Sequence, residues 1–167
     1  VTTGESNNLI GGLAGDALTT GSFNQVLGVA ALSSDTKGSR AVAIGHGALL
    51  NQNFTTATDN YNVAIGHNAG LSVTTGIRST LIGSLAGDAI TSANYNVALG
   101  YSSLSSETLG SKSTALGYLS LTAQNFTTAT DVYNVAVGYQ AGGSVTTATD
   151  NTLIGGLAGD ALTTGGN

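Results

Sequence analysis

Short stretches of this chain place small or apolar residues on both sides of an extended strand. In residues 62–70, which read NVAIGHNAG, one side of such a strand would carry Val63 and Ile65, and the other Ala64 and Gly66. A strand with two such sides is expected to be buried on both of them. We expect one side to line an interior. The other side needs a partner surface, and we expect glycine and alanine there to let the partner approach closely.

An aliphatic residue followed by glycine recurs nine times along the chain, at successive intervals of 17, 17, 21, 17, 17, 17, 21 and 17. A period of about 20 residues, built from residues that favour strands and without helical spacing, is typical of a solenoid. We therefore predict an all-β fold, a parallel β-solenoid of nine coils. We call the nine recurring glycines the anchor glycines: Gly11, Gly28, Gly45, Gly66, Gly83, Gly100, Gly117, Gly138 and Gly155.

The interval pattern itself repeats after every four coils. The sequence LIGGLAGDALTT begins at Leu9 and again at Leu153, and LIGSLAGDAITS begins at Leu81. We predict one continuous solenoid over 1–167, made of super-repeats 1–72 and 73–144 and a partial copy 145–167. Because the first and last residues fall inside a copy, we expect a segment of a longer fibre.

A polar residue stands four positions before most of the anchor glycines, for example Asn24, Asn62, Asn96 and Asn134. Stacked at about 4.8 Å from coil to coil, such side chains can bond one another as well as the nearby backbone. The sequence therefore predicts a polar ladder that runs along the solenoid.

Composition argues against several classes of protein. The net charge is −5, and the four basic residues are scattered, which argues against a nucleic-acid partner. No stretch comes close to the run of apolar residues that a membrane span needs, so we expect no membrane insertion by this segment. Because each coil holds few large aliphatic side chains, a lone solenoid would be marginally stable, and we expect association with copies of itself.

The pattern N-x-A-I-G-x-x-A, seen as NVAIGHNA from Asn62 and as NVAVGYQA from Asn134, resembles the head repeats of trimeric autotransporter adhesins. It is equally similar to the β-roll repeats of bacteriophage tail fibres. The resemblance covers the whole chain. It implies a left-handed β-roll, three copies of which pack around a threefold axis, on a virion tail fibre or a bacterial cell surface. These coils are longer than those of adhesin heads, and no adhesin neck, stalk or membrane anchor occurs among these residues.

Two patterns bear on metal binding. His46 and His67 each follow an anchor glycine and should be neighbours one coil apart, but the positions one super-repeat later are tyrosines. We therefore expect a column of rings rather than a metal site. Residues 11–18 nearly match a calcium-binding β-roll motif, with Ala14 in place of a glycine. We expect no metal or other cofactor, and we interpret Asp16, Asp88 and Asp160 as turn caps.

The two longer intervals must bulge outward. Each would place aromatic rings and a carboxylate on the surface, and such groups commonly hold sugars or partner surfaces. In the alternative, Phe54 packs beneath its own loop. Asn53 and Asn125 fit the glycosylation sequon there, which would matter only in a secreted eukaryotic protein. The candidate recognition residues are Phe54, Asp59, Tyr61, Phe126, Asp131 and Tyr133.

We expect no enzymatic activity. A polysaccharide-cleaving pair could be Asp35 with Asp59 or Asp59 with Glu5, but nothing in the sequence selects either pair. The preferred hypothesis is the structural shaft or head of an extracellular adhesive fibre that attaches to a glycan or protein receptor. A self-assembling filament with a purely mechanical or matrix role is the alternative. An ice-binding solenoid and a polysaccharide depolymerase rank lower.

Overall fold

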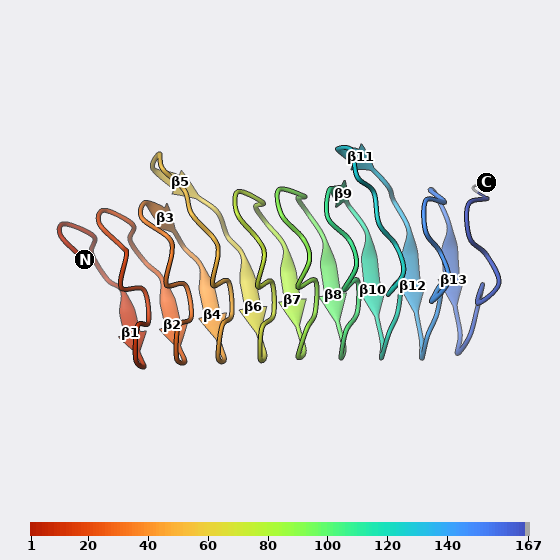
Figure 1. Cartoon of the computed structure of the whole chain (residues 1–167), viewed down its shortest axis with the longest axis horizontal. Helices are drawn as coiled ribbons and strands as arrows, with labels where there is room; N and C mark the ends of the chain where they lie inside the picture. The colour runs from red at the N-terminus through yellow and green to blue at the C-terminus, as the bar shows by residue number, and fades with distance from the viewer. Residues whose placement is uncertain (166–167) are drawn as a thin grey trace.

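Nine three-residue strands, one from each coil, form a single parallel sheet that runs the length of the molecule (Figure 1). The computed structural model describes residues 1–165, so Gly166 and Asn167 of the predicted partial copy lie outside the described residues. The order along the sheet follows the chain: β1 (Asn8–Ile10), β2 (Gln25–Leu27), β4 (Val42–Ile44), β6 (Val63–Ile65), β7 (Thr80–Ile82), β8 (Val97–Leu99), β10 (Thr114–Leu116), β12 (Val135–Val137) and β13 (Thr152–Ile154).

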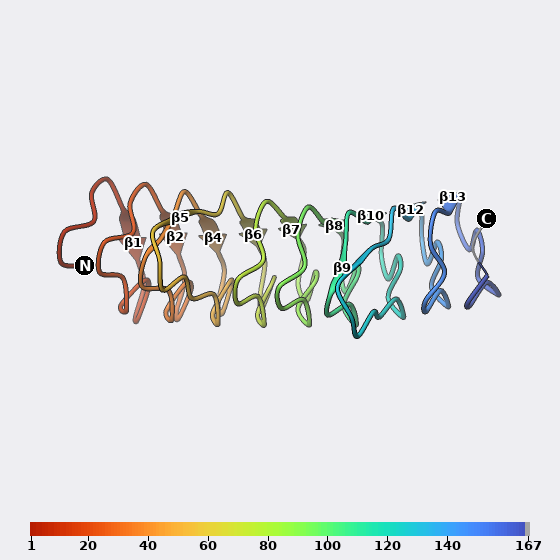
Figure 2. The same cartoon turned by 90° about the horizontal axis from the view of Figure 1, so that it is seen from above.

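Equivalent residues of successive coils lie side by side in this sheet. Ala64 of β6 pairs with Leu81 of β7, and Leu81 pairs in turn with Ala98 of β8. Seen from above, the coils stack one after another along a single axis (Figure 2). The predicted parallel β-solenoid and its spacing are therefore confirmed.

Each of the two long coils forms a short second sheet with the coil that precedes it. β3 (Gly38–Ser39) pairs with β5 (Thr58–Asp59), and β9 (Gly110–Ser111) pairs with β11 (Thr130–Asp131). The loops that hold β5 and β11 project beyond their neighbours at the upper edge of the molecule (Figure 1). The additional residues of the longer intervals therefore bulge outward, as predicted.

The middle residue of each strand faces the interior. Ala64, Leu81 and Ala98 are at most 1% exposed, and they belong to one continuous core that includes Leu49 and Ile90. The two flanking residues of each strand, such as Val63 and Ile65, face outward and stay partly exposed. The expectation that the alanine side of the strand meets a partner is therefore wrong, because that side lines the interior. The coil is thin, so the strand contributes mostly small side chains to a core that already holds large leucines such as Leu49.

The anchor glycines are required by the stacking of the backbone. Gly66 has φ of 140°, a conformation that residues with a Cβ rarely adopt. A Cβ there would lie 2.6 Å from the carbonyl group of Gly83 in the next coil. Glycine thus lets adjacent coils approach to hydrogen-bonding distance at this corner.

The predicted polar ladder lies inside the solenoid, beside the sheet. Asn62 is buried; its Oδ1 accepts from the backbone N–H of Ser79 at 3.0 Å, and its Nδ2 donates to the carbonyl of Gly76 at 2.7 Å. Asn96 repeats both contacts with Ser113 and Gly110. The ladder therefore bonds mainly to the backbone of the next coil, which satisfies buried groups that would otherwise lack partners.

Candidate functional site

The outer side of the sheet is an apolar strip, which we call the apolar face. It has an aliphatic residue in every coil directly before the anchor glycine, and valine at four of the strand starts. Leu99, in the middle of the molecule, is 46% exposed, so its own chain does not cover this strip. The residues before the glycines are Ile10, Leu27, Ile44, Ile65, Ile82, Leu99, Leu116, Val137 and Ile154, and the valines are Val42, Val63, Val97 and Val135.

The apolar face extends along the whole sheet. Nine strands of three residues cover roughly 40 Å by 10 Å, from standard strand spacings. Contiguous apolar patches of several hundred Å² commonly mark interaction sites on soluble proteins. A shallow groove of about 380 Å³ lies on this face near the first coils, between Ile10, Leu27 and Ile44.

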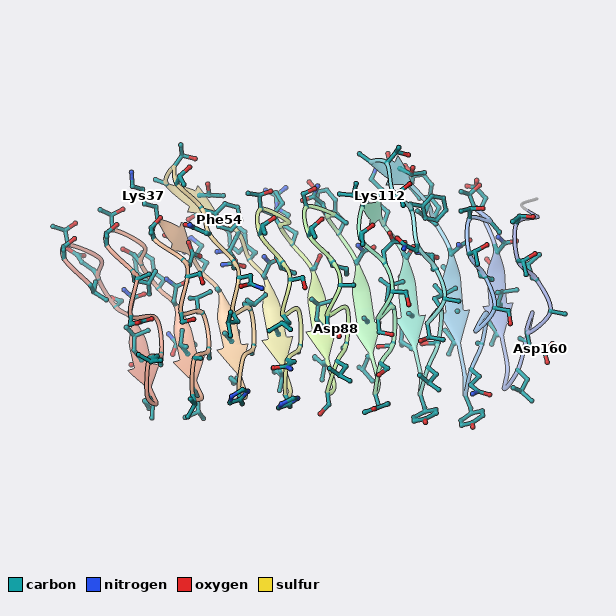
Figure 3. The ribbon with its side chains drawn as sticks, viewed as in Figure 1. Lys37, Phe54, Asp88, Lys112 and Asp160 are labelled. Carbon is teal, nitrogen blue, oxygen red and sulfur yellow. The ribbon has the colours of Figure 1, made fainter. Side chains whose placement is uncertain are left out.

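The predicted recognition residues of the long coils divide into two groups. Phe54 and Phe126 are only 6% and 8% exposed, which matches the alternative in which the ring packs beneath its own loop. Asp59, Tyr61, Asp131 and Tyr133 reach the surface. Figure 3 shows Phe54 below the loop of β5 and Lys112 beside the loop of β11. Of the predicted recognition residues, the carboxylates and the phenols are therefore the exposed ones, and the phenylalanines are not.

A buried carboxylate holds each long loop in place. Asp35 is fully buried; its Oδ1 accepts from the backbone N–H of Gly38 and of Phe54, both at 3.0 Å. Its Oδ2 accepts from Nε2 of Gln52 at 2.7 Å, and the side-chain oxygen Oε1 of Gln52 accepts from Nδ2 of Asn62 at 2.8 Å. The carboxylate of Asp35 therefore links the loop to the interior ladder. A catalytic acid that acted together with Asp59 would have to reach solvent, and Asp35 does not.

Glu107 occupies the equivalent position in the next super-repeat. It too is fully buried, and it accepts from the backbone N–H of Gly110 at 2.6 Å and of Phe126 at 3.1 Å. Gln124 donates to its second oxygen at 2.8 Å. Sequence reasoning missed this role; the only signal was that an acid recurs at this place in both super-repeats.

A second exposed column of side chains lies five positions before the anchor glycines, and cations alternate with aromatic rings along it. The guanidinium of Arg40 lies 4.9 Å from the ring centre of Phe23 and 5.8 Å from that of Tyr61. All members have φ between 54° and 67°, an unusual conformation for bulky residues. We call this the mixed column: Phe23, Arg40, Tyr61, Arg78, Tyr95, Lys112 and Tyr133.

Polar contacts tie the mixed column together. Arg78 Nη1 donates to the hydroxyl of Tyr95 at 2.9 Å, and Arg40 forms an ion pair with Asp59 at 3.0 Å. Lys112 lies 2.7 Å from Asp131 and 3.0 Å from the hydroxyl of Tyr133, and these hydrogen bonds raise the pKa of Lys112. The basic residues are therefore not scattered in space, because three of them lie in one column.

Rings also line the position directly after the anchor glycines, in what we call the ring column. His46 and His67 stack with ring centres 5.3 Å apart and planes within 12°. Tyr118 stacks on Tyr101 at 5.6 Å and on Tyr139 at 5.3 Å. The predicted ring column is thus present. In the described part of the chain, no three His, Cys, Asp or Glu side chains gather as a metal site would require.

The carboxylates interpreted as turn caps do not bind the backbone of other residues. Among residues 1–165, the side chains of Asp16, Asp88 and Asp160 accept no hydrogen bond from another residue's N–H. One oxygen of Asp88 is shielded from solvent without any partner, and burial raises the pKa of this carboxyl above its usual 3.8. Figure 3 shows Asp88 and Asp160 on the solenoid.

Comparison of the chain with models of protein families, with curated proteins and with solved structures found no significant match. In the residues that the structure describes, no helix is long and apolar enough to cross a membrane.

Proposed function

We propose that this chain forms the shaft of an extracellular, homotrimeric adhesive fibre, of the kind found in bacteriophage tail fibres and bacterial surface adhesins. The observation that carries the proposal is the apolar face, which runs through all nine coils and stays at least partly exposed along its length in the single chain. The resemblance of NVAIGHNA and NVAVGYQA to the repeats of such fibres supports it.

Copies of the same chain are the occupant that fits the apolar face best. A second copy has the same spacing between coils, so each coil can meet an equivalent coil along the whole length. A partner with another repeat would lose this match after a few coils. Three sheets turned toward a common axis would remove the aliphatic side chains of every copy from water, which supplies the burial that one thin solenoid lacks.

Attachment is assigned to the long coils. Their loops project from the shaft and hold Asp59 in β5 and Asp131 in β11, and the exposed Tyr61 and Tyr133 follow two residues later in the chain. Repetition along each chain and across three chains would present many weak sites at fixed spacing. Such multivalency can raise apparent affinity by roughly 10² to 10⁴ over a single site.

The mass of the chain in solution tests the assembly. Light scattering coupled to gel filtration should give three times the chain mass of 16.4 kDa. Replacing Ile65 and Leu99 with lysine should give a monomer with an unchanged β-type circular dichroism spectrum. The control variant adds the same charge at exposed positions outside the strands, Thr56→Lys with Thr75→Lys, and should remain trimeric. A monomeric wild type would refute the trimer, and an open series of larger species would favour the filament.

Binding to bacterial cells and to a glycan array tests the adhesive role. The variant Tyr61→Ala with Tyr133→Ala should bind more weakly than the wild type while keeping its mass. Equal binding by both proteins would remove the long coils as the attachment site. A trimer that binds neither cells nor glycans would favour the purely mechanical role.

A further inference from the structure

Tyr101, Tyr118 and Tyr139 form an uninterrupted row of phenols on three successive coils. Their rings lie nearly parallel, with planes within 15° and 7° and centres 5.6 and 5.3 Å apart. The three side chains are 48%, 44% and 55% exposed, so a dissolved oxidant can reach each of them. Ser84 and Gly156 occupy the same position in the coils on either side, which limits the row to three rings.

The remaining tyrosines of the chain have a different setting. Tyr61, Tyr95 and Tyr133 are 48%, 45% and 50% exposed, close to the values of the row. Each is separated from the next tyrosine by a coil that carries Arg78 or Lys112 in the mixed column. The protein therefore holds two sets of equally exposed phenols, and only one set has phenol neighbours on the next coil.

We propose that the row Tyr101–Tyr118–Tyr139 is a site of oxidative cross-linking, in which dityrosine joins adjacent coils. The oxidant is a one-electron system of the haem peroxidase class acting with hydrogen peroxide. It removes one electron and one proton from each of two phenols. The two phenoxyl radicals couple through ring carbons next to the hydroxyl-bearing carbons, and the hydrogen on each of these carbons moves to oxygen to restore the phenols. The two electrons and two protons reduce one hydrogen peroxide to two waters.

The stacking selects which phenols couple. Exposed side chains change rotamer within picoseconds to nanoseconds, so neighbouring rings at 5.3–5.6 Å can turn edge to edge soon after both are oxidised. Coupling between Tyr101 and Tyr118 would close a loop the length of one short coil, and coupling between Tyr118 and Tyr139 a loop the length of one long coil. Such a bond would join neighbouring coils covalently. The chain has no cysteine, so disulfides cannot supply this kind of cross-link.

The experiment treats the whole chain with peroxidase and hydrogen peroxide and follows dityrosine fluorescence, intact mass and tryptic peptides. Trypsin cuts after Arg78 and Lys112, so Tyr101 falls in peptide 79–112 and Tyr118 in peptide 113–167. We expect a chain that has lost two hydrogens without gaining mass on a denaturing gel, and in which these two peptides are joined through Tyr101 and Tyr118. The cross-linked chain should also unfold at a higher temperature than the untreated one.

Two variants give the proposal its test. Tyr118→Phe keeps a ring in the stack but cannot form a phenoxyl radical, so the joined peptides and the dityrosine fluorescence should be lost. The matched control, Tyr61→Phe with Tyr95→Phe and Tyr133→Phe, should cross-link like the wild type. Both should keep the circular dichroism spectrum of the wild type. The proposal is overturned if Tyr118→Phe yields as much dityrosine, if the bonds map to the mixed column, or if they form only between chains.

Discussion

Two sets of carboxylates contact the long loops, and they differ in surroundings. Asp35 and Glu107 are fully buried and accept hydrogen bonds from neutral N–H donors alone. Asp59 and Asp131 have side chains 51% and 53% exposed, and each forms an ion pair with a cation. Exposed ion pairs are worth at most about 1 kcal/mol, whereas each buried donor left without an acceptor costs about 1–3 kcal/mol. The carboxylates without a counter-ion should therefore matter more for stability than those with one.

The largest effect is expected for Glu107→Ala. At least three donors, from Gly110, Phe126 and Gln124, would lose their acceptor inside the solenoid. The free energy of unfolding should fall by about 3 kcal/mol or more, as measured by urea denaturation. Asp131→Ala is the matched control and should lower it by less than about 1 kcal/mol. Equal losses in the two variants would contradict the comparison.

An intermediate effect is expected for Asp35→Asn, which separates charge from hydrogen-bond pattern. The amide placed at Oδ2 would face the Nε2 donor of Gln52, so two donors would meet, at a cost of about 1–3 kcal/mol. Adding Gln52→Glu should recover most of this loss, because a carboxylate at position 52 accepts both from the new amide at position 35 and from Asn62. If the double variant is no more stable than the single one in urea denaturation, the hydrogen-bond pattern is not what holds the loop.

The smallest effect is expected at Asp88, which has neither cation nor donor for its shielded oxygen. Burial raises its pKa in the folded state, so protonation favours the fold. Its contribution to stability is complete below the unfolded value near 3.8 and is lost as pH rises through the raised pKa. Asp88→Asn should therefore be slightly more stable than wild type at pH 7. Urea denaturation from pH 3 to pH 7 should show this difference shrinking as pH falls, and a difference independent of pH would count against this account.

The sequence was sufficient to predict the coils because their cause is local. Gly66 and its equivalents adopt a conformation closed to other residues, and that requirement recurs at a spacing which only stacked coils satisfy. Which side of the strand faces the interior could not be predicted, because the side chains of Val63 and Ala64 are both compatible with burial. What decided it was the size of the interior, set by leucines from other parts of the coil such as Leu49.

The side-chain networks were harder to foresee, because their members are brought together by the turns. Asn62 was predicted as part of the ladder, but Asp35 and Gln52 are a whole coil apart in the sequence and nothing in their spacing connects them to it. The mixed column was present in the sequence five positions before the anchor glycines. It was missed because Arg40 and Arg78 are two coils apart, with Tyr61 between them in the column, so each was interpreted as an isolated charge.

Each coil touches only the coils beside it, and the segments at Leu9 and Leu153 share the same run of letters, LIGGLAGDALTT. Recombination between such copies in the gene would add or remove whole groups of coils while recreating every junction unchanged. The number of coils can therefore change during evolution without any intermediate sequence whose coils fail to stack. A single insertion between strand and anchor glycine, in contrast, would shift every backbone contact at that coil.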